Sequence, residues 1–216
     1  MARQLIVFDL DGTLVDSRRD LANATNALLV QCGASPLSEE RVGRMVGDGA
    51  ATLVARAFSA AGVSQPADAL DRFLAIYSDH LLDHTRPYPG IPEALEQLRS
   101  RSRLAVLTNK PLASTRRILD GLGLAQYFAH DAVLGGDGPF PRKPDPAALR
   151  HLAAQAGAPL TGTLLVGDSA IDWRTARAAP VAVCLARYGF GFDGVPIDQL
   201  GMEDRVIASP GELMSL

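Results

Sequence analysis

Two carboxylates lie two residues apart at the point where the first apolar run of the sequence ends. The run Leu5–Phe8 has the composition of a buried strand and is followed by Asp9 and Asp11. Side chains two residues apart on a strand point to the same side, and burying two like charges together is costly unless a cation lies between them. Carboxylate oxygens of this kind suit Mg²⁺. We therefore expect a metal site at the end of this strand.

The turn after these carboxylates offers a place for an anion. Gly12 and Thr13 can present backbone N–H groups in a tight turn, and we expect them to bind substrate. A turn with two aspartate caps is an alternative interpretation of the same residues. An EF-hand is excluded, because the sixth position counted from Asp9 is Leu14 and not the glycine that such a loop requires.

Three further polar clusters follow in order along the chain. Two of them stand at the end of a short apolar run, and one follows a glycine-rich loop. Their residues are Thr108, Asn109 and Lys110 after the run 104–107, Lys143 after the loop 135–141, and Asp168 and Asp172 after the run 164–167. Of the 21 Lys and Arg residues only Lys110 and Lys143 are lysines, and both fall in these clusters. A lysine supplies a compact point charge where an arginine would supply a planar fork.

Together the four clusters resemble the motifs of the haloacid dehalogenase superfamily, and specifically those of its phosphatases. The resemblance implies that Asp9 is the nucleophile, which forms an aspartyl-phosphate, and that Asp11 is the acid and base. It implies that Thr108 and Asn109 hold a phosphoryl oxygen and that Lys143 balances the charge of Asp9 and of the transferring group. Lys110 has no role in this pattern, and we expect it at the surface.

The same resemblance implies the metal ligands. Asp9, the carbonyl group of Asp11 and Asp168 are expected to hold one Mg²⁺. Asp172 lies one helical turn after Asp168 and is expected to support the site from behind. Asp11 disfavours a dehalogenase, which lacks the second carboxylate. A phosphonatase is disfavoured because its Schiff-base lysine would lie in the cap, and no lysine precedes Lys110.

Further segments narrow the resemblance to the phosphoglycolate phosphatases. These segments are 45–50, 88–90, 135–137 and 187–189. The expected activity is therefore Mg²⁺-dependent hydrolysis of a small phosphomonoester, with 2-phosphoglycolate as the first candidate. A phosphatase of another small phosphate ester or of pyrophosphate, and a phosphate-binding regulator without turnover, are the alternatives. The intact set of site residues argues against the regulator, whereas Ala179-Pro180 and the proline-rich loop 138–141 depart from the family pattern and leave substrate preference open.

The periodicity of the apolar residues divides the chain into two kinds of structure. Residues 17–84 show helical spacing alone, whereas from residue 87 short apolar runs alternate with helical segments. Helices are expected over 17–32, 38–46, 50–61, from 66 to about 81, 91–101, 111–122, 145–156 and 170–178, and strands over 104–107, 132–134, 164–166 and 181–185.

This division predicts an α/β protein with a Rossmann-like parallel sheet as in the haloacid dehalogenase fold. The core is expected to comprise residues 1–16 and 85–216, with residues 17–84 inserted as a helical cap. A helical insert after the first strand must lie over the carboxyl ends of the strands, where ligands bind in such sheets. It would therefore act as a lid. The break at Gly47 and Gly49 is the part expected to reach the substrate, with Arg44 and Arg56 as flanking cations.

The composition is that of an ordinary globular protein. The chain has 216 residues, of which 47% are hydrophobic, and a formal net charge of -3. The isoelectric point of ≈ 5.8 gives no basic surface for nucleic acid or for an anionic membrane, so neither is expected as a partner. The expected partner is a small phosphate ester, and the chain is expected to be a monomer or a homodimer.

The cysteines and the apolar runs indicate the cellular compartment in which the protein is expected. Cys32 and Cys184 lie far apart and form no C-x-x-C pattern, so we expect both to be reduced. No apolar run approaches the length that crosses a membrane, and the first run is too short for a signal peptide. These features predict a cytoplasmic protein.

Overall fold

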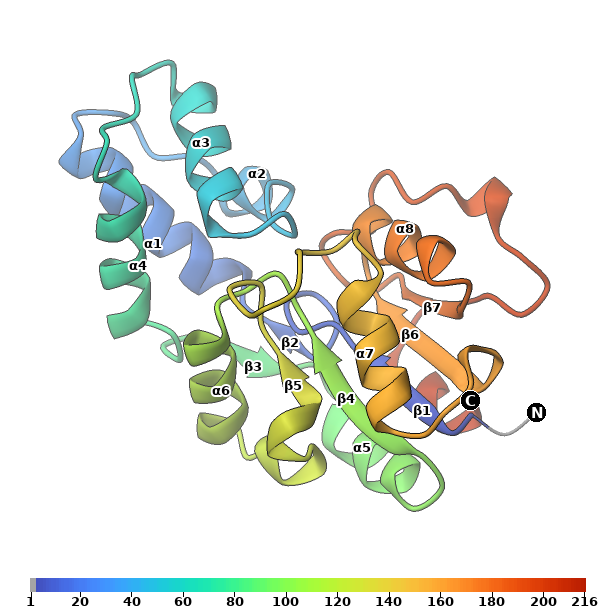
Figure 1. Ribbon diagram of the computed structural model, residues 1–216. Coiled ribbons are helices and arrows are strands. Elements are labelled where there is room, and N and C mark those ends of the chain that lie inside the picture. The colour runs from blue at the N-terminus through green and yellow to red at the C-terminus, as the bar shows by residue number, and fades with distance from the viewer. Residues whose placement is uncertain (1–2) are drawn as a thin grey trace.

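A six-stranded parallel sheet forms the centre of the computed structural model, which describes residues 3–216 (Figure 1). The order of the strands is β5-β4-β1-β6-β7-β8. Their bounds are β1 (Leu5–Phe8), β4 (Arg103–Leu107), β5 (Val133–Leu134), β6 (Thr163–Gly167), β7 (Ala182–Ala186) and β8 (Arg205–Ile207). The predicted α/β architecture with a Rossmann-like parallel sheet is confirmed.

Strand β1 lies inside the sheet and is covered on both faces. Leu5 pairs with Arg103 of β4 and with Thr163 of β6. Ile6 and Phe8 belong to one apolar core and Leu5 and Val7 to the other, because successive side chains alternate between the faces. A strand buried on both faces has no polar side, which explains the continuous apolar run.

Helices cover both faces of the sheet. The core that contains Phe8 also includes residues of α5 (Ile91–Arg99) and α6 (Leu112–Gly121). The core that contains Val7 includes residues of α7 (Ala147–Gln155) and α8 (Ala170–Ala178). Short 3-10 helices complete the connections: η1 (Ala125–Tyr127), η2 (His130–Ala132), η3 (Leu160–Gly162), η4 (Ile197–Gln199) and η5 (Pro210–Ser215).

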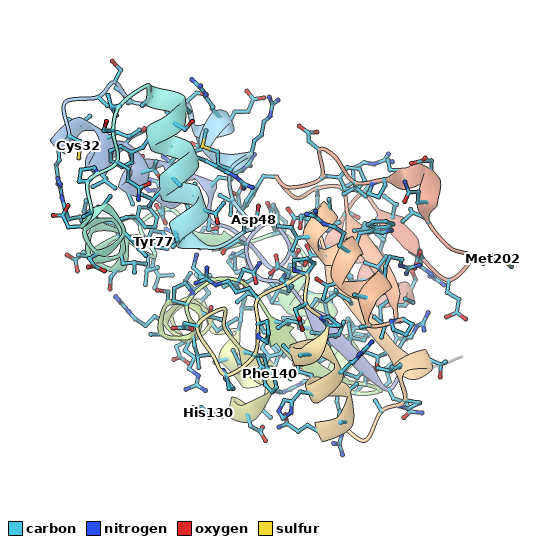
Figure 2. All side chains as sticks on the ribbon, turned by 45° about the horizontal axis from the view of Figure 1, so that its top comes forward. Cys32, Asp48, Tyr77, His130, Phe140 and Met202 are labelled. Atoms are coloured by element: carbon cyan, nitrogen blue, oxygen red, sulfur yellow. The ribbon has the colours of Figure 1, made fainter. Side chains whose placement is uncertain are left out.

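Four helices form a separate group beyond the carboxyl ends of the strands (Figure 1). They are α1 (Arg18–Gln31), α2 (Glu39–Gly43), α3 (Ala50–Ala61) and α4 (Ala69–Asp79). Their apolar faces meet around buried residues such as Leu28, Phe58 and Phe73. Figure 2 shows Tyr77 and Asp48 on the side of this group nearer the sheet and Cys32 on the far side.

The two connections between the helical group and the sheet lie side by side. They form a two-stranded antiparallel ribbon of β2 (Val15–Asp16) and β3 (Arg86–Pro87). Next to the ribbon, the buried carboxylate of Asp20 accepts hydrogen bonds from the backbone of His84 at 2.9 Å and from the Thr85 hydroxyl at 2.7 Å. Burial alone raises the pKa of Asp20, but the hydrogen bonds from Thr85 and His84 outweigh it and hold the pKa below its usual value.

Several predicted elements differ in extent from the observed ones. The second helix spans only Glu39–Gly43, because Ser38 caps it by accepting a hydrogen bond from the Arg41 N–H at 3.2 Å and the glycine pair 47 and 49 follows soon after. The fourth begins at Ala69, three residues after the proline expected to open it. The ribbon of β2 and β3 and the edge strand β8 were not predicted.

Neither cysteine forms a disulfide, as predicted, with Cys184 buried and Cys32 half-buried. Within residues 3–216, no helix combines the length and the hydropathy needed to cross a membrane.

Candidate active site

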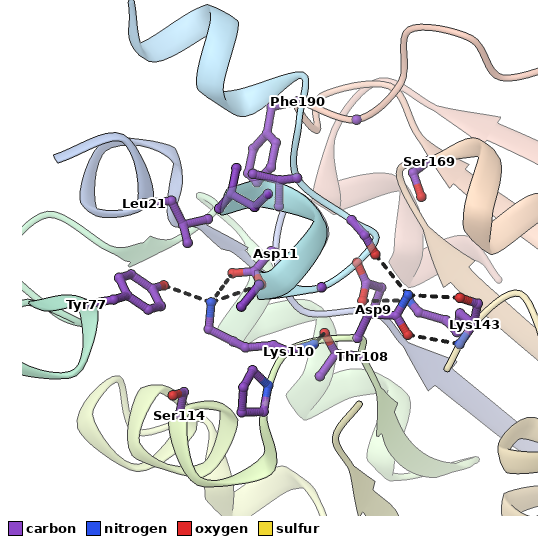
Figure 3. Close-up of a pocket in the computed structure, with 18 of the residues that line it drawn as sticks. Asp9, Asp11, Leu21, Tyr77, Thr108, Lys110, Ser114, Lys143, Ser169 and Phe190 are labelled. Carbon is purple, nitrogen blue, oxygen red and sulfur yellow. Dashed lines mark hydrogen bonds and ion pairs between the residues drawn. The ribbon is translucent and has the colours of Figure 1, made fainter. Parts of the chain in front are cut away.

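A cavity opens between the carboxyl ends of the strands and the helical group (Figure 3). Residues expected to act on substrate or metal line it from both sides. From the sheet come Asp9, Asp11, Thr108, Asn109, Lys143 and Asp168, and from the helical group come Gly47 and Gly49. The free volume of the cavity is about 50 Å³. A single water needs roughly 10–15 Å³ on a similar measure, so the cavity as it stands admits only a small molecule.

Asp9 is held at the end of β1 by the sheet itself. Its backbone N–H donates to the Val166 carbonyl at 2.8 Å, and its carboxylate accepts a hydrogen bond from Lys143 Nζ at 2.7 Å. Burial raises the pKa of Asp9 to about 6, and the nearby carboxylates add to this effect while the charge of Lys143 opposes it. The carboxylate that the resemblance assigns as nucleophile is therefore costly to ionise without a further cation.

Lys143 joins two of the buried carboxylates. Its Nζ lies 2.7 Å from an oxygen of Asp9 and 2.7 Å from an oxygen of Asp172. Burial lowers the pKa of the ammonium group, but Asp172 and Asp9 outweigh it, so the pKa lies above its usual range. The side chain of Lys143 is thus charged and fixed in one position.

The side chain of Asn109 connects the loop that carries Lys143 with the helical group. Its Oδ1 accepts from the Lys143 N–H at 2.9 Å, and its Nδ2 donates to the Lys143 carbonyl at 3.0 Å and to the Gly47 carbonyl at 2.9 Å. The amide is therefore used in holding loops, and only other parts of Asn109 are available to a substrate. The neighbouring Thr108 hydroxyl accepts from the Lys110 N–H at 3.2 Å, which leaves its own proton available to donate.

Three buried carboxylates lie close enough to share a metal ion. One oxygen each of Asp9, Asp168 and Asp172 fall within 4.8 Å of one another. Asp172 already has partners, since it accepts hydrogen bonds from Lys143 and from the hydroxyl of Ser169 at 2.6 Å in the capping box of α8. Burial raises the pKa of Asp168 well above its usual value, and the charges of Asp172 and Asp9 add to it. This excess of buried negative charge on hard oxygen donors fits a divalent cation.

Gly12 lies against this cluster, but not in the way the sequence predicted. It has a φ of 88°, and a Cβ atom there would lie 2.0 Å from Oδ2 of Asp168, so only glycine fits. The N–H of Gly12 donates to the Val15 carbonyl at 2.9 Å and that of Thr13 to the Leu10 carbonyl at 3.3 Å. The two N–H groups that were expected to bind an anion therefore donate hydrogen bonds within their own turn.

The surface location expected for Lys110 is wrong. Lys110 is buried, and its Nζ donates to both carboxylate oxygens of Asp11, at 3.0 and 3.1 Å, and to the Tyr77 hydroxyl at 2.8 Å (Figure 3). Burial lowers the pKa of its ammonium group, but Asp11 and Tyr77 outweigh it, so the pKa lies above its usual range. The hydroxyl of Ser17, the residue before α1, also donates to Asp11, at 2.5 Å. Asp11 is therefore held by two groups.

The arginines expected near the glycine break do not line the cavity. Arg56 pairs with Asp48 at 2.5 Å, and Arg44 pairs with Glu40 at 2.7 Å while its side chain is 60% exposed. Sequence reasoning also missed Gly191, whose N–H donates to Asp168 at 2.7 Å, and Tyr77. Both lysines of the sequence fall in the polar clusters that carry the motifs, and this was a signal that Lys110 belongs to the site. Tyr77 gave no such signal, because it falls at an apolar position of a predicted helix.

The comparisons with known proteins agree with this site. Residues 6–186 match the family model of the haloacid dehalogenase-like hydrolases. A phosphoglycolate phosphatase from Rhodospirillum rubrum is 44% identical over 205 residues, which cover 91% of this chain and 83% of the relative. One from Cereibacter sphaeroides is 40% identical over 190 residues, covering 86% of this chain and 85% of the relative.

A solved structure extends the likeness to the fold. The crystal structure of a predicted phosphoglycolate phosphatase from Haemophilus somnus has a TM-score of 0.89 and 32% sequence identity, and the match covers 99% of this chain and 97% of the other. The chain belongs to the haloacid dehalogenase-like hydrolases. The predicted resemblance to the phosphoglycolate phosphatases and the predicted class, a phosphoric monoester hydrolase, are confirmed.

Proposed function

We propose that this protein is a Mg²⁺-dependent phosphatase whose substrate is 2-phosphoglycolate and whose nucleophile is Asp9. The observation that carries the proposal is the group of buried charges at the end of β1, where Asp9, Lys143 and Asp168 meet in a cavity. The substrate is inferred from relatives named phosphoglycolate phosphatase that are up to 44% identical to this chain.

In the first half of the reaction, Asp9 attacks phosphorus and the ester bond breaks. A new bond forms between an Asp9 oxygen and phosphorus, and the leaving oxygen takes a proton from Asp11 to become the hydroxyl group of glycolate. Lys143 stays beside Asp9 and balances the negative charge that builds up on the phosphoryl oxygens. The free hydroxyl proton of Thr108 can donate to one of these oxygens.

In the second half, water releases the phosphate. Asp11 now accepts a proton from the water, whose oxygen attacks phosphorus while the bond to Asp9 breaks. Asp9 and Asp11 return to their starting states, so the cycle closes. Asp9, Asp168 and the Asp11 carbonyl would hold the divalent cation, which would supply positive charge to offset the charge of the phosphoryl group. Asp172 fixes Lys143.

We also propose that residues 17–84 act as a cap over a core of residues 1–16 and 85–216. The support is the paired ribbon β2–β3 at both connections and the cavity lined from both parts. In this proposal Gly47 and Gly49 contact the substrate, whereas the engaged N–H groups of Gly12 and Thr13 leave these residues a role in shaping the turn.

The test is the release of phosphate from a panel of small phosphate esters and pyrophosphate, with Mg²⁺ and with a chelator. We expect 2-phosphoglycolate to give the highest kcat/KM, and only with Mg²⁺. A higher kcat/KM for another ester or for pyrophosphate would reject the substrate and keep the enzyme class. No hydrolysis of any ester would favour a phosphate-binding regulator.

A further inference from the structure

The cavity contains one cation that the proposed reaction does not use. Among the described residues that line it, the ammonium groups are those of Lys110 and Lys143. Lys143 is committed to Asp9 and Asp172, each at 2.7 Å. Lys110 contacts Asp11, the group that gives its proton to the leaving oxygen, so it lies on the side of the cavity that receives the leaving group.

The helical group offers no other charge to that part of the substrate. The side chains through which it lines the cavity are apolar except for Tyr77, and they come from α1, α3, α4 and the loop before α3. They are Leu21, Val46, Ala50, Leu53, Phe73 and Leu74. A charged leaving group in this apolar surrounding needs a partner, because an unpaired buried charge is costly. Lys110 is the cation within reach.

Lys110 and Tyr77 together present two hydrogen-bond donors. An ammonium group has three N–H bonds: Tyr77 accepts one, and the two oxygens of Asp11, at 3.0 and 3.1 Å, share a second in a three-centre bond, which leaves the third. The Tyr77 oxygen accepts from Lys110, so its own O–H proton is free for a second acceptor. Both side chains are buried and linked by this bond at 2.8 Å, so the two donors are held together (Figure 3).

We propose that Lys110 and Tyr77 bind a carboxylate on the leaving group of the substrate. The class of substrate is a phosphate ester with a carboxylate attached to the carbon that bears the ester oxygen. In such a molecule the leaving oxygen meets Asp11 while the carboxylate reaches the Nζ beside it. The N-terminus of α3, which lines the cavity at Gly49 and Ala50, adds a favourable partial charge. The proposal rests on the proposed function, since it takes Asp11 as the acid.

The competing role for Lys110 is to position Asp11 alone. A residue that only positions the acid affects every ester alike, whereas a residue that binds the carboxylate affects charged leaving groups more. The discriminating quantity is therefore the ratio of kcat/KM for 2-phosphoglycolate to that for 2-hydroxyethyl phosphate, an ester of similar size whose leaving group is neutral.

The experiment measures this ratio for the full-length protein and for Lys110→Met, Tyr77→Phe and Arg117→Met. Arg117 is the matched control, because its guanidinium also donates to a hydroxyl of α4, that of Ser78 at 2.5 Å, but lies outside the cavity. We expect Lys110→Met to lower the ratio about 10- to 100-fold and Tyr77→Phe to lower it about tenfold or less. Arg117→Met should leave the ratio unchanged.

Equal losses with both esters in Lys110→Met would overturn the proposal, as would a wild-type protein that does not prefer the charged ester. If Lys110→Met does not fold, Tyr77→Phe decides by the same ratio. If the wild type hydrolyses neither ester, the proposed function fails, and the carboxylate subsite is then tested by binding alone.

The dissociation constants of the two esters are measured for Asp9→Asn with and without Lys110→Met. Tighter binding of the charged ester that Lys110→Met removes would support the carboxylate subsite, and equal binding of the two esters to Asp9→Asn would reject it.

Discussion

At the scale of single residues, the site is a set of buried charges that balance only in part. Asp9, Asp168 and Asp172 lie close together, and Lys143 forms ion pairs with Asp9 and Asp172. Burial raises the pKa of Asp9 and of Asp168, because a charged carboxylate loses its hydration there and finds too few partners. The buried carboxylates therefore carry an excess of negative charge, which a divalent cation would balance.

The raised pKa of Asp9 predicts the direction in which stability changes with pH. Because the pKa is raised from 3.8 to about 6, the folded state binds the Asp9 proton more tightly than the unfolded state does. Without metal, the carboxyl group of Asp9 makes the free energy of unfolding fall as pH rises through the interval between these two pKa values, by roughly 3 kcal/mol in total. We expect Asp9→Asn, which cannot ionise, to gain stability relative to wild type between pH 4 and pH 7 in denaturant titrations with a chelator. A difference that is constant with pH would contradict this reasoning.

Lys143 should matter for both folding and activity. Lys143→Met leaves two buried carboxylates without their cation, which costs about 3–5 kcal/mol of stability. We expect kcat to fall by at least about a hundredfold as well, since charge balance at the phosphoryl group is lost. Arg150→Met is the control, because Arg150 is exposed and its guanidinium donates to the Ala178 carbonyl, away from the cavity. Near-normal kcat in Lys143→Met would remove Lys143 from the mechanism.

The residue patterns predicted the carboxylates and Lys143 better than they predicted Lys110. Strand-end aspartates are visible because an apolar run ends at them. The burial of Lys110 depends on Asp11 and on Tyr77, which lie 99 and 33 residues away along the chain. A contact of that kind has no local pattern, so sequence reasoning placed Lys110 at the surface.

At the scale of elements, the loop before α3 contacts the residues that follow β4. Its Gly47 carbonyl accepts from Asn109, and Gly49 has a φ of 89° at the start of α3. A Cβ atom at Gly49 would lie 3.0 Å from Nη1 of Arg142 and 3.4 Å from the Asn109 carbonyl oxygen. A side chain at Gly49 would therefore be strained by the positive φ and would crowd the guanidinium group of Arg142.

Gly49→Val tests whether this loop sets selectivity. The substitution strains the backbone, at a cost of about 1–3 kcal/mol, and pushes the loop away from Asn109. We expect KM for 2-phosphoglycolate to rise about tenfold, with a smaller change for an unselective aryl phosphate. Gly62→Ala is the control, because Gly62 also has a positive φ, 70°, at the end of α3 but no atom within 4 Å of its Cβ position. Equal losses with both substrates would assign the loop to closure of the cap.

Elements of regular periodicity were predictable, and short edge elements were not. The helix Ala50–Ala61 was predicted with its observed bounds, since Gly49 and Gly62 punctuate it. Strand β8 has three residues among charged neighbours, and β2 and β3 have two each, so none carries a period that can be recognised. Strand β8 forms because the chain returns to an existing edge of the sheet. Strands β2 and β3 form because the chain enters and leaves the helical group at the same place.

At the scale of the whole molecule, the fold brings four separated segments to one edge of a parallel sheet. The cores on its two faces fix β1 between β4 and β6, and the polar residues that follow these strands meet there. This convergence was predictable from the order of the apolar runs, because parallel strands present their carboxyl ends together. The position of the helical group over this edge was predicted as well, but the individual contacts across the cavity, such as that of Asn109 with Gly47, were not.

A metal that binds only the folded state should stabilise the whole molecule. We expect Mg²⁺ in hundredfold excess over its dissociation constant to raise the free energy of unfolding by about 2.7 kcal/mol. The melting temperature should rise accordingly in thermal scans with and without a chelator. Asp168→Asn should lose this rise, and Ca²⁺ should inhibit turnover, because its larger coordination shell misplaces the nucleophile. Full activity and an unchanged melting temperature in excess chelator would reject the metal.

The most direct test of the central claim is to trap the phosphoryl group on the protein. Wild-type protein is mixed with 2-phosphoglycolate and Mg²⁺, quenched in acid within a turnover, digested and analysed by mass spectrometry. We expect one added phosphoryl group on the peptide that carries Asp9, removed by hydroxylamine and absent from Asp9→Asn. Release of phosphate from the same mixture with no label on that peptide, or with the label on another residue, would contradict it.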